Sequence, residues 1–356
     1  MTTGMKKFTK VCLYTALIMF IIGAAMCGVG WLFGGFRQLN SMDIRGITGG
    51  FADIPFVYKV LPGGGKAYRF YSDDDTVWQK NYGNWDRISD HPGDIGDIDG
   101  PAPALNLTAD TLQDLYIDLG GCTLYIEESE DEYVRLAMSG DTDNFRYHAE
   151  DGKLSIVRNP DWSYWHTGLG HADDKVYLCL PKGMAFRRID ILFGAGRIES
   201  AGLMTAGAYI EVGAGECNID SLTADEEAMF SVGAGRIELD SLSCDIAGIE
   251  VGAGALSIND AEIATDTDID LGMGSVDISG LIKGYMNVDC SMGTVNLDLL
   301  DAEKDHDYEI DCSMGTVNIG SHVYSGLADE KLISNGSSSY FDIDCSMGTV
   351  NITFAE

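Results

Sequence analysis

The segment Ile249-Glu-Val-Gly-Ala-Gly-Ala-Leu-Ser-Ile258 decides the fold, because its pattern recurs through the second half of the chain. Apolar residues alternate with polar or small ones before the glycines, at Ile249 and Val251, and again after them, at Leu256 and Ile258. A period of two is typical of a strand with one buried face. The segment therefore predicts two short strands joined at a corner where glycine supplies unusual backbone angles.

Alignment on the last glycine of the corner reveals eight related units between residues 191 and 356. The aligned glycines are Gly196, Gly215, Gly235, Gly254, Gly274, Gly293, Gly315 and Gly348. One unit alone cannot bury its apolar stripe, but equivalent units stacked in parallel can. The repeat predicts an all-β chain whose regular part is a parallel β-solenoid of about eight rungs. An antiparallel sandwich is the alternative, because short regular strands also fit that fold.

The spacing of the glycines lengthens in the last two intervals, which places extra residues near 299–308 and 320–340. We expect these residues to form loops on one edge of the stack. The final unit, Ile343 to Ile352, is expected to be its open end. That edge is then either covered by the 320–340 loop or available to a partner strand or a second copy of the protein.

Residues 105–190 are expected to form an irregular β layer that caps the other end of the repeats at 191–356. Within this layer, Ile117 to Ile126 resembles one unit with Cys122 in place of the aligned glycine. The preceding residues, 37–104, show no sustained period and are rich in turn-forming sequence. They predict a juxtamembrane linker.

Residues 11–36 carry no charge and follow Lys6, Lys7 and Lys10. As a helix this segment would reach about 39 Å, enough to cross a hydrocarbon core of ~30 Å. The flanking lysines predict that residues 1–10 are cytoplasmic. We therefore expect an uncleaved transmembrane helix that holds the remaining residues outside the cytoplasm.

The chain has 356 residues, with 56 acidic and 23 basic side chains and a formal net charge of −33. This charge excludes nucleic-acid binding, which needs clustered lysine and arginine. Hydrophobic residues make up 45% of the chain, so it can bury a core and fold in spite of its charge. A partner is expected to be cationic, neutral or bridged by a metal ion.

Several features together resemble a bacterial domain-of-unknown-function family that is often labelled "putative adhesin". They are the lysine-flanked anchor, the strand Asp151-Gly-Lys-Leu-Ser-Ile156, the strand Val176-Tyr-Leu-Cys-Leu-Pro181, and the serial Val-Gly-Ala-Gly units. The resemblance covers roughly residues 105–356. It implies a β-solenoid, a bacterial cell-envelope setting and a role in sensing envelope stress. With the anchor, we expect a bacterial cell-membrane location and a protein or cell-wall partner. It brings no catalytic residues, and the Ser-Met-Gly corners of the last three units depart from it.

Asp270, Asp289, Asp311 and Asp344 occupy one outward position of the repeat. Like charges ~4.8 Å apart repel by about 1 kcal/mol even in water, so we expect weak binding of divalent cations there. No other cofactor is expected. Cys290, Cys312 and Cys345 occupy one inward position and are expected to be packed, reduced thiols.

The alternative function is an enzyme acting on cell-envelope glycans. Such an enzyme needs convergent carboxylates or basic residues for acidic sugars. The repeats show no convergent cluster and only five basic residues, namely Arg197, Arg236, Lys283, Lys304 and Lys331. The sequence therefore favours a binding, structural or envelope-sensing module over an enzyme.

Overall fold

The computed structural model describes residues 86–87, 104–139, 145–158, 174–325 and 329–355, which all lie in one compact unit, Asp75–Glu356. Most of these residues lie in β-strands. The opening strands are β1 (Asp86–Arg87), β2 (Ala104–Thr108), β3 (Asp114–Leu119), β4 (Cys122–Ser129), β5 (Tyr133–Ser139), β6 (Phe145–Glu150), β7 (Lys153–Arg158), β8 (Lys175–Pro181) and β9 (Ala185–Phe193). The repeat strands are β10 (Gly196–Val212), β11 (Glu216–Val232), β12 (Arg236–Val251), β13 (Ala255–Leu271), β14 (Ser275–Ile282), β15 (Tyr285–Cys290) and β16 (Thr294–Leu299). The last part holds the 3-10 helix η5 (Glu303–Asp305) and the strands β17 (His306–Cys312), β18 (Thr316–Ile319), β19 (His322–Ser325), β20 (Asp329–Ile333), β21 (Ser339–Cys345) and β22 (Thr349–Phe354).

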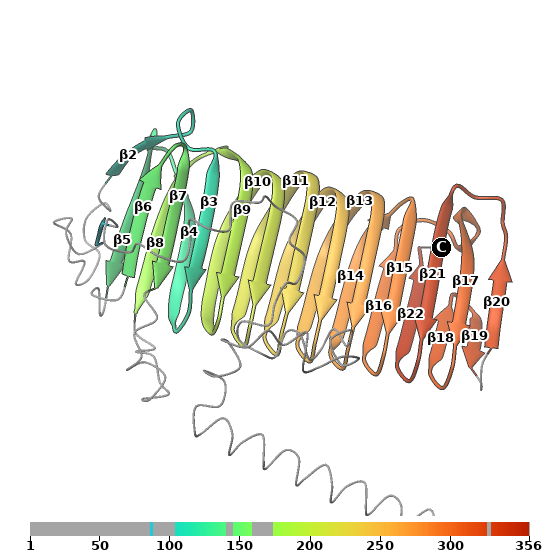
Figure 1. Ribbon diagram of the computed structural model, residues 1–356. Helices are drawn as coiled ribbons and strands as arrows, with labels where there is room; N and C mark the ends of the chain where they lie inside the picture. The colour runs from blue at the N-terminus through green and yellow to red at the C-terminus, as the bar shows by residue number, and fades with distance from the viewer. Residues whose placement is uncertain (1–85, 88–103, 140–144, 159–173, 326–328, 356) are drawn as a thin grey trace, which may run out of the picture. The chain divides into compact units, whose positions relative to one another are not determined.

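Equivalent units of the repeat stack in parallel and in register, as the sequence predicted (Figure 1). Each rung contributes one strand before the glycine corner and one after it. The strands before the corner form one ladder, which includes β9, β15 and the second halves of β10 to β13. The strands after the corner form a second ladder, which includes β4, β14, β16 and the first halves of β10 to β13. This parallel register excludes the antiparallel sandwich for the repeats.

The apolar stripes of the two ladders make the core. Ile249, Val251, Leu256 and Ile258, the positions that define the repeat, are at most 3% exposed. Strict alternation of inward and outward residues places every second side chain in this core, and the intervening side chains form the outer faces. A binding or catalytic site on the repeats must therefore be formed by outward-facing residues or by residues of the corners.

The opening layer joins the same ladders. Cys122 pairs in register with Gly196, so β3 and β4 form a rung beside β9 and β10, as the sequence predicted. Beyond them β7 and β8 are parallel to β3 and β4, whereas β5 and β6 are antiparallel to β8 and β7. The outermost strands, β1 and β2, pair with β6 and β5.

The prediction that the final unit forms the open end is wrong. Strand β21 lies between β15 and β17, and β22 lies between β16 and β18, so the last unit in sequence is an inner rung (Figure 1). The end of the stack is the rung of β17 and β18. Residues 320–340 are more than a loop, because β20 and β19 pair antiparallel with β17 and β18 and cover that edge. The chain then turns back to fill the position between the two earlier rungs.

The role predicted for the aligned glycines also needs correction. Of the eight, only Gly196 has a positive φ, at 111°. The other seven are required by close approach between rungs. A Cβ at Gly293 would lie 2.6 Å from the carbonyl oxygen of Gly274, and a Cβ at Gly254 would lie 2.6 Å from Val232 Cγ1. Glycine therefore lets backbones stack at the corner, where any side chain would separate them.

Among the described residues, no helix is both long and apolar enough to cross a membrane. The anchor predicted at 11–36 lies outside the described residues, as do the cytoplasmic segment predicted at 1–10 and most of the linker predicted at 37–104.

Candidate functional site

The four predicted aspartates lie at one position of four consecutive rungs. The register pairs Asp270 with Asp289, Asp289 with Asp344, and Asp344 with Asp311. Asp344 is therefore a neighbour of Asp289, an order that follows from the inner position of the final unit. Asp270 is half-buried and the other three are exposed. We call these four residues the acidic ladder.

Two further columns of the same strands lie on one side of the acidic ladder, away from the glycine corner. One contains Asp268, Asn287, Asp342 and Glu309, and the other contains Asp266, Tyr285, Tyr340 and Asp307. The rings of Tyr285 and Tyr340 stack with centroids 6.0 Å apart and an interplanar angle of 9°. The Tyr285 hydroxyl donates to Asp342 at 3.4 Å, and the Tyr340 hydroxyl donates to Glu309. We call the three columns together the acidic face.

Burial and then mutual repulsion raise the pKa values of carboxyl groups on the acidic face. Partial burial, followed by the charges of Asp289, Asp311 and Asp342, raises the pKa of Asp344 above its ordinary value. Partial burial and then Asp268 raise the pKa of Asp289 in the same direction. Ionised carboxylates on this face therefore oppose folding, and a bound cation would relieve the opposition.

The carboxylates stand one per rung in columns and do not converge on a point. Among the residues described by the structure, no group of three or more His, Cys, Asp or Glu side chains is arranged to hold a metal ion. The acidic face is suited to attract cations over an extended surface, in the manner of a charged strip. The two tyrosines were missed by sequence reasoning because they are 55 residues apart, and only the inner position of the final unit brings them together.

The polar side chains in one column of the opposite ladder form hydrogen bonds with one another. Asn318 donates its side-chain amide to Asn351 at 2.6 Å, Asn351 donates to Asn296 at 2.7 Å, and Asn296 donates to Asp277 at 2.6 Å. These amides stabilise the stacking of neighbouring rungs. Their hydrogen-bonding groups are largely occupied, which makes this ladder a less promising binding surface than the acidic face.

The three predicted thiols lie inward, as expected, but in a different order. Cys345 stands between Cys290 and Cys312, and all three are free and fully buried. Burial is the largest cause that raises the pKa of Cys290 to about 12. At neutral pH its thiol is protonated and packs as an apolar group.

A second polar cluster joins three residues that sequence reasoning did not connect. His306 Nδ1 lies 2.8 Å from Ser339 Oγ, and His306 Nε2 lies 3.0 Å from Asp301 Oδ2. The imidazole is 1% exposed and stacks on Phe341 with ring centroids 4.1 Å apart. The Ser339 hydroxyl donates to the Gly284 carbonyl at 3.0 Å. A nucleophilic serine must reach a substrate, whereas this one is 8% exposed and holds neighbouring rungs together.

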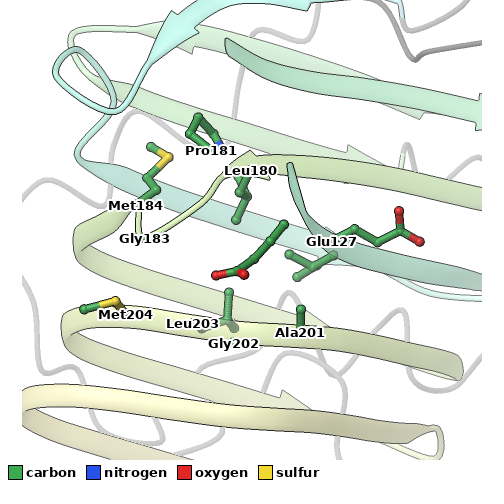
Figure 2. Close-up of a pocket in the computed structure, with 11 residues that line it drawn as sticks. Glu127, Leu180, Pro181, Gly183, Met184, Ala201, Gly202, Leu203 and Met204 are labelled. Carbon is green, nitrogen blue, oxygen red and sulfur yellow. The ribbon is translucent and has the colours of Figure 1, made fainter. Parts of the chain in front are cut away.

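The hollow in Figure 2 lies between β4, β8 and the middle of β10 and is lined by apolar side chains such as Leu180, Met184 and Leu203. Its cavity volume is about 10 Å³. That space is about what one water molecule needs. The hollow is a packing feature of the opening layer and has no room for a ligand.

The model of the Toastrack DUF4097 family matches residues 112–353. A "putative adhesin" from Bacteroides fragilis is 12% identical, and the alignment covers 71% of this chain and 100% of that one with a TM-score of 0.38. A "putative cell adhesion protein" from Clostridium sporogenes is 14% identical over 70% of this chain and 96% of that one, with a TM-score of 0.21. A "putative adhesin" from Parabacteroides merdae is 13% identical over 71% and 97%, with a TM-score of 0.26. No protein with a curated function matches the sequence.

Proposed function

The chain belongs to the Toastrack DUF4097 family, and from that premise we propose that it is a membrane-anchored module that binds cationic ligands outside the cytoplasm through its acidic face. The observation that carries the proposal is the run of carboxylates and stacked tyrosines over four consecutive rungs. The ligand class is a cationic peptide or protein segment of the cell envelope. Binding of such a ligand also serves a structural or envelope-sensing role.

Two physical effects favour this ligand class. Columns of like charge raise the local concentration of cations and speed their association. The faces of Tyr285 and Tyr340 offer cation–π contacts to lysine or arginine side chains.

The location rests on the sequence alone. An uncharged segment at 11–36 behind three lysines is typical of an anchor with a cytoplasmic N-terminus. A C-terminal alkaline phosphatase fusion to the full chain tests the topology, since that enzyme becomes active only outside the cytoplasm. Activity in whole cells supports the proposed location, and an inactive but intact fusion contradicts it.

The function is tested by titrating the full chain, in detergent micelles, with a decalysine peptide at low salt. Asp289→Asn, Asp311→Asn and Asp344→Asn together are expected to weaken binding about tenfold or more, because three ion pairs contribute about 0.5–1 kcal/mol each. The matched control is Asp220→Asn, Asp240→Asn and Asp260→Asn, which removes three exposed charges from the other ladder. An equal loss of decalysine affinity in both variants would show that the affinity depends on net charge alone, and would contradict a specific acidic face.

Divalent cations are expected to stabilise the folded chain at neutral pH. The raised pKa values of Asp289 and Asp344 mean that ionisation opposes folding, so stability falls as pH rises through the folded-state values. Relief of about 1 kcal/mol of repulsion should raise the melting temperature by about 2–4 °C. Calorimetry with millimolar CaCl2 at low ionic strength should show this rise at pH 7. The rise should shrink at pH 4, and an unchanged melting temperature at pH 7 would exclude cation binding.

The alternative function is an enzyme acting on envelope glycans, which would need a pair of convergent carboxylates. The contact of Ser339, His306 and Asp301 supplies one carboxylate and is buried, so it does not favour this alternative. Release of reducing sugar from purified cell-wall glycan by the full chain would favour the enzyme over the binding module, and no release would favour the binding module.

A further inference from the structure

Four methionines lie side by side at the corner between the two ladders. Met273, Met292, Met347 and Met314 occupy the middle of the corner on four consecutive rungs, and their side chains are 49–64% exposed. Backbone hydrogen bonds fix this order, from Met292 N to Gly272 O, from Met347 N to Ser291 O and from Met314 N to Ser346 O, all at 2.7–2.8 Å. We call these four side chains the methionine ridge.

Packing does not explain the methionine ridge. The same corner position in the three preceding rungs holds Ala214, Ala234 and Ala253, all of them exposed. The fold therefore needs no side chain larger than a methyl group at this position. Methionine adds three rotatable bonds and an apolar surface that water meets directly. The ridge therefore exposes a row of thioethers that the packing of the core does not require.

We propose that the methionine ridge binds a soft monovalent cation, Cu(I) or its analogue Ag(I), through thioether sulfurs of neighbouring rungs. Thioethers are soft ligands that select Cu(I) over the harder Ca²⁺ and Mg²⁺. A zinc–thiolate bond is about 2.3 Å long, so two metal–sulfur bonds of similar length in line span about 4.6 Å. Neighbouring rungs are ~4.8 Å apart, so adjacent methionines can hold one ion between them without moving the backbone.

The surroundings of the ridge fit this chemistry. Two glycines flank Met273, and a serine and a glycine flank each of the other three methionines, so the site carries no competing carboxylate at the corner itself. On each rung, the aspartate of the acidic ladder lies three residues before the methionine of the ridge. The negative charge of the ladder therefore attracts a cation toward the corner. The thiols of Cys290, Cys345 and Cys312 are buried beneath the same corners, where Cys290 Sγ contacts the Gly293 carbonyl at 3.5 Å. An ion on the ridge is therefore held by thioethers alone.

Titration calorimetry of the full chain with Ag(I), in chloride-free buffer and detergent micelles, tests the proposal. Saturable binding is expected. Met292→Leu together with Met347→Leu should weaken it about 100-fold or more, since loss of outer-shell partners alone costs about 10–100-fold. Leucine keeps the apolar surface of the ridge and removes only the sulfur. Labelled methionine methyl resonances of the ridge should shift with Ag(I), whereas that of the buried Met184 should not.

The matched control replaces Cys290, Cys312 and Cys345 by valine. Valine is the natural residue at this inward position in other rungs, as Val212, Val232 and Val251. This variant should fold, as checked by its circular dichroism spectrum, and bind Ag(I) as the unmodified chain does. Three results would each overturn the proposal: no Ag(I) binding by the unmodified chain, undiminished binding by the leucine variant, or loss of binding in the valine variant.

Discussion

Replacement of Gly274 by alanine is expected to destabilise the folded chain by about 3 kcal/mol or more. A Cβ at this position would overlap the carbonyl oxygen of Gly254 in the neighbouring rung and would lie 2.9 Å from Val251 Cγ1. Neither neighbour can give way, because one is backbone and the other belongs to the core. Calorimetry should show a melting temperature lower by about 6–12 °C.

Gly194 supplies the matched control, because it lies at a similar corner but has room for a methyl group. The nearest atom to a Cβ there, the Leu119 carbonyl oxygen, is 4.0 Å away. Gly194→Ala is expected to change the stability by less than about 1 kcal/mol, in either direction. Similar losses in the two variants would show that backbone conformation, and not rung-to-rung contact, fixes glycine at the corners.

Replacement of Phe341 by alanine is expected to cost about 3–5 kcal/mol. Its side chain is fully buried and its ring packs against His306 and, edge to face at 5.7 Å, against Tyr308. Phe341 also stands in register between Met286 and Tyr308, so rungs on both sides contribute to its burial. Chemical denaturation should show a reduced free energy of unfolding.

Leu332→Ala is the control for Phe341→Ala, since Leu332 on the covering strand β20 is 70% exposed. Its loss should change the free energy of unfolding by less than about 0.5 kcal/mol. If Phe341→Ala were as mild as Leu332→Ala, the final unit would not be an inner rung.

The repeat could be predicted from the sequence because its signal is local and repeated. Alternation around Val251 and Leu256 identified the inward residues, and the match of Cys122 to Gly196 extended the register into the opening layer. Each rung needs only its own apolar stripe and a neighbour, so one aligned column of residues predicts the structure of the whole stack.

The order of the last rungs could not be predicted, for a reason that the sequence itself contains. The segment Asp-Cys-Ser-Met-Gly-Thr-Val-Asn occurs identically at 289–296, 311–318 and 344–351. Any pair of these segments stacks with equal local energy, so strand sequence alone does not distinguish the possible orders. The choice is made by the covering strands β19 and β20 and by the connections around them, which have no counterpart in the repeat.

The same ambiguity limited the prediction of the site. The acidic ladder was identified correctly as a column, but its order and its tyrosines depend on which rung neighbours which. Tyr285 and Tyr340 meet only because β21 follows β15 in space. The cluster of His306 and Ser339 likewise depends on the contact of β17 with β21. Contacts between distant units are set by topology, which local periodicity does not encode.

Hydrogen exchange of the full chain, followed by mass spectrometry, tests the stacking order most directly. The inner position of the final unit predicts that peptides covering 340–345 and 349–352 exchange as slowly as those covering β15 and β16, because both of their edges are paired. Peptides covering β19 and β20 should exchange faster, since the structure pairs each of them on one side. Fast exchange across 340–352, with slow exchange across 306–319, would place the final unit at an open edge and contradict the account.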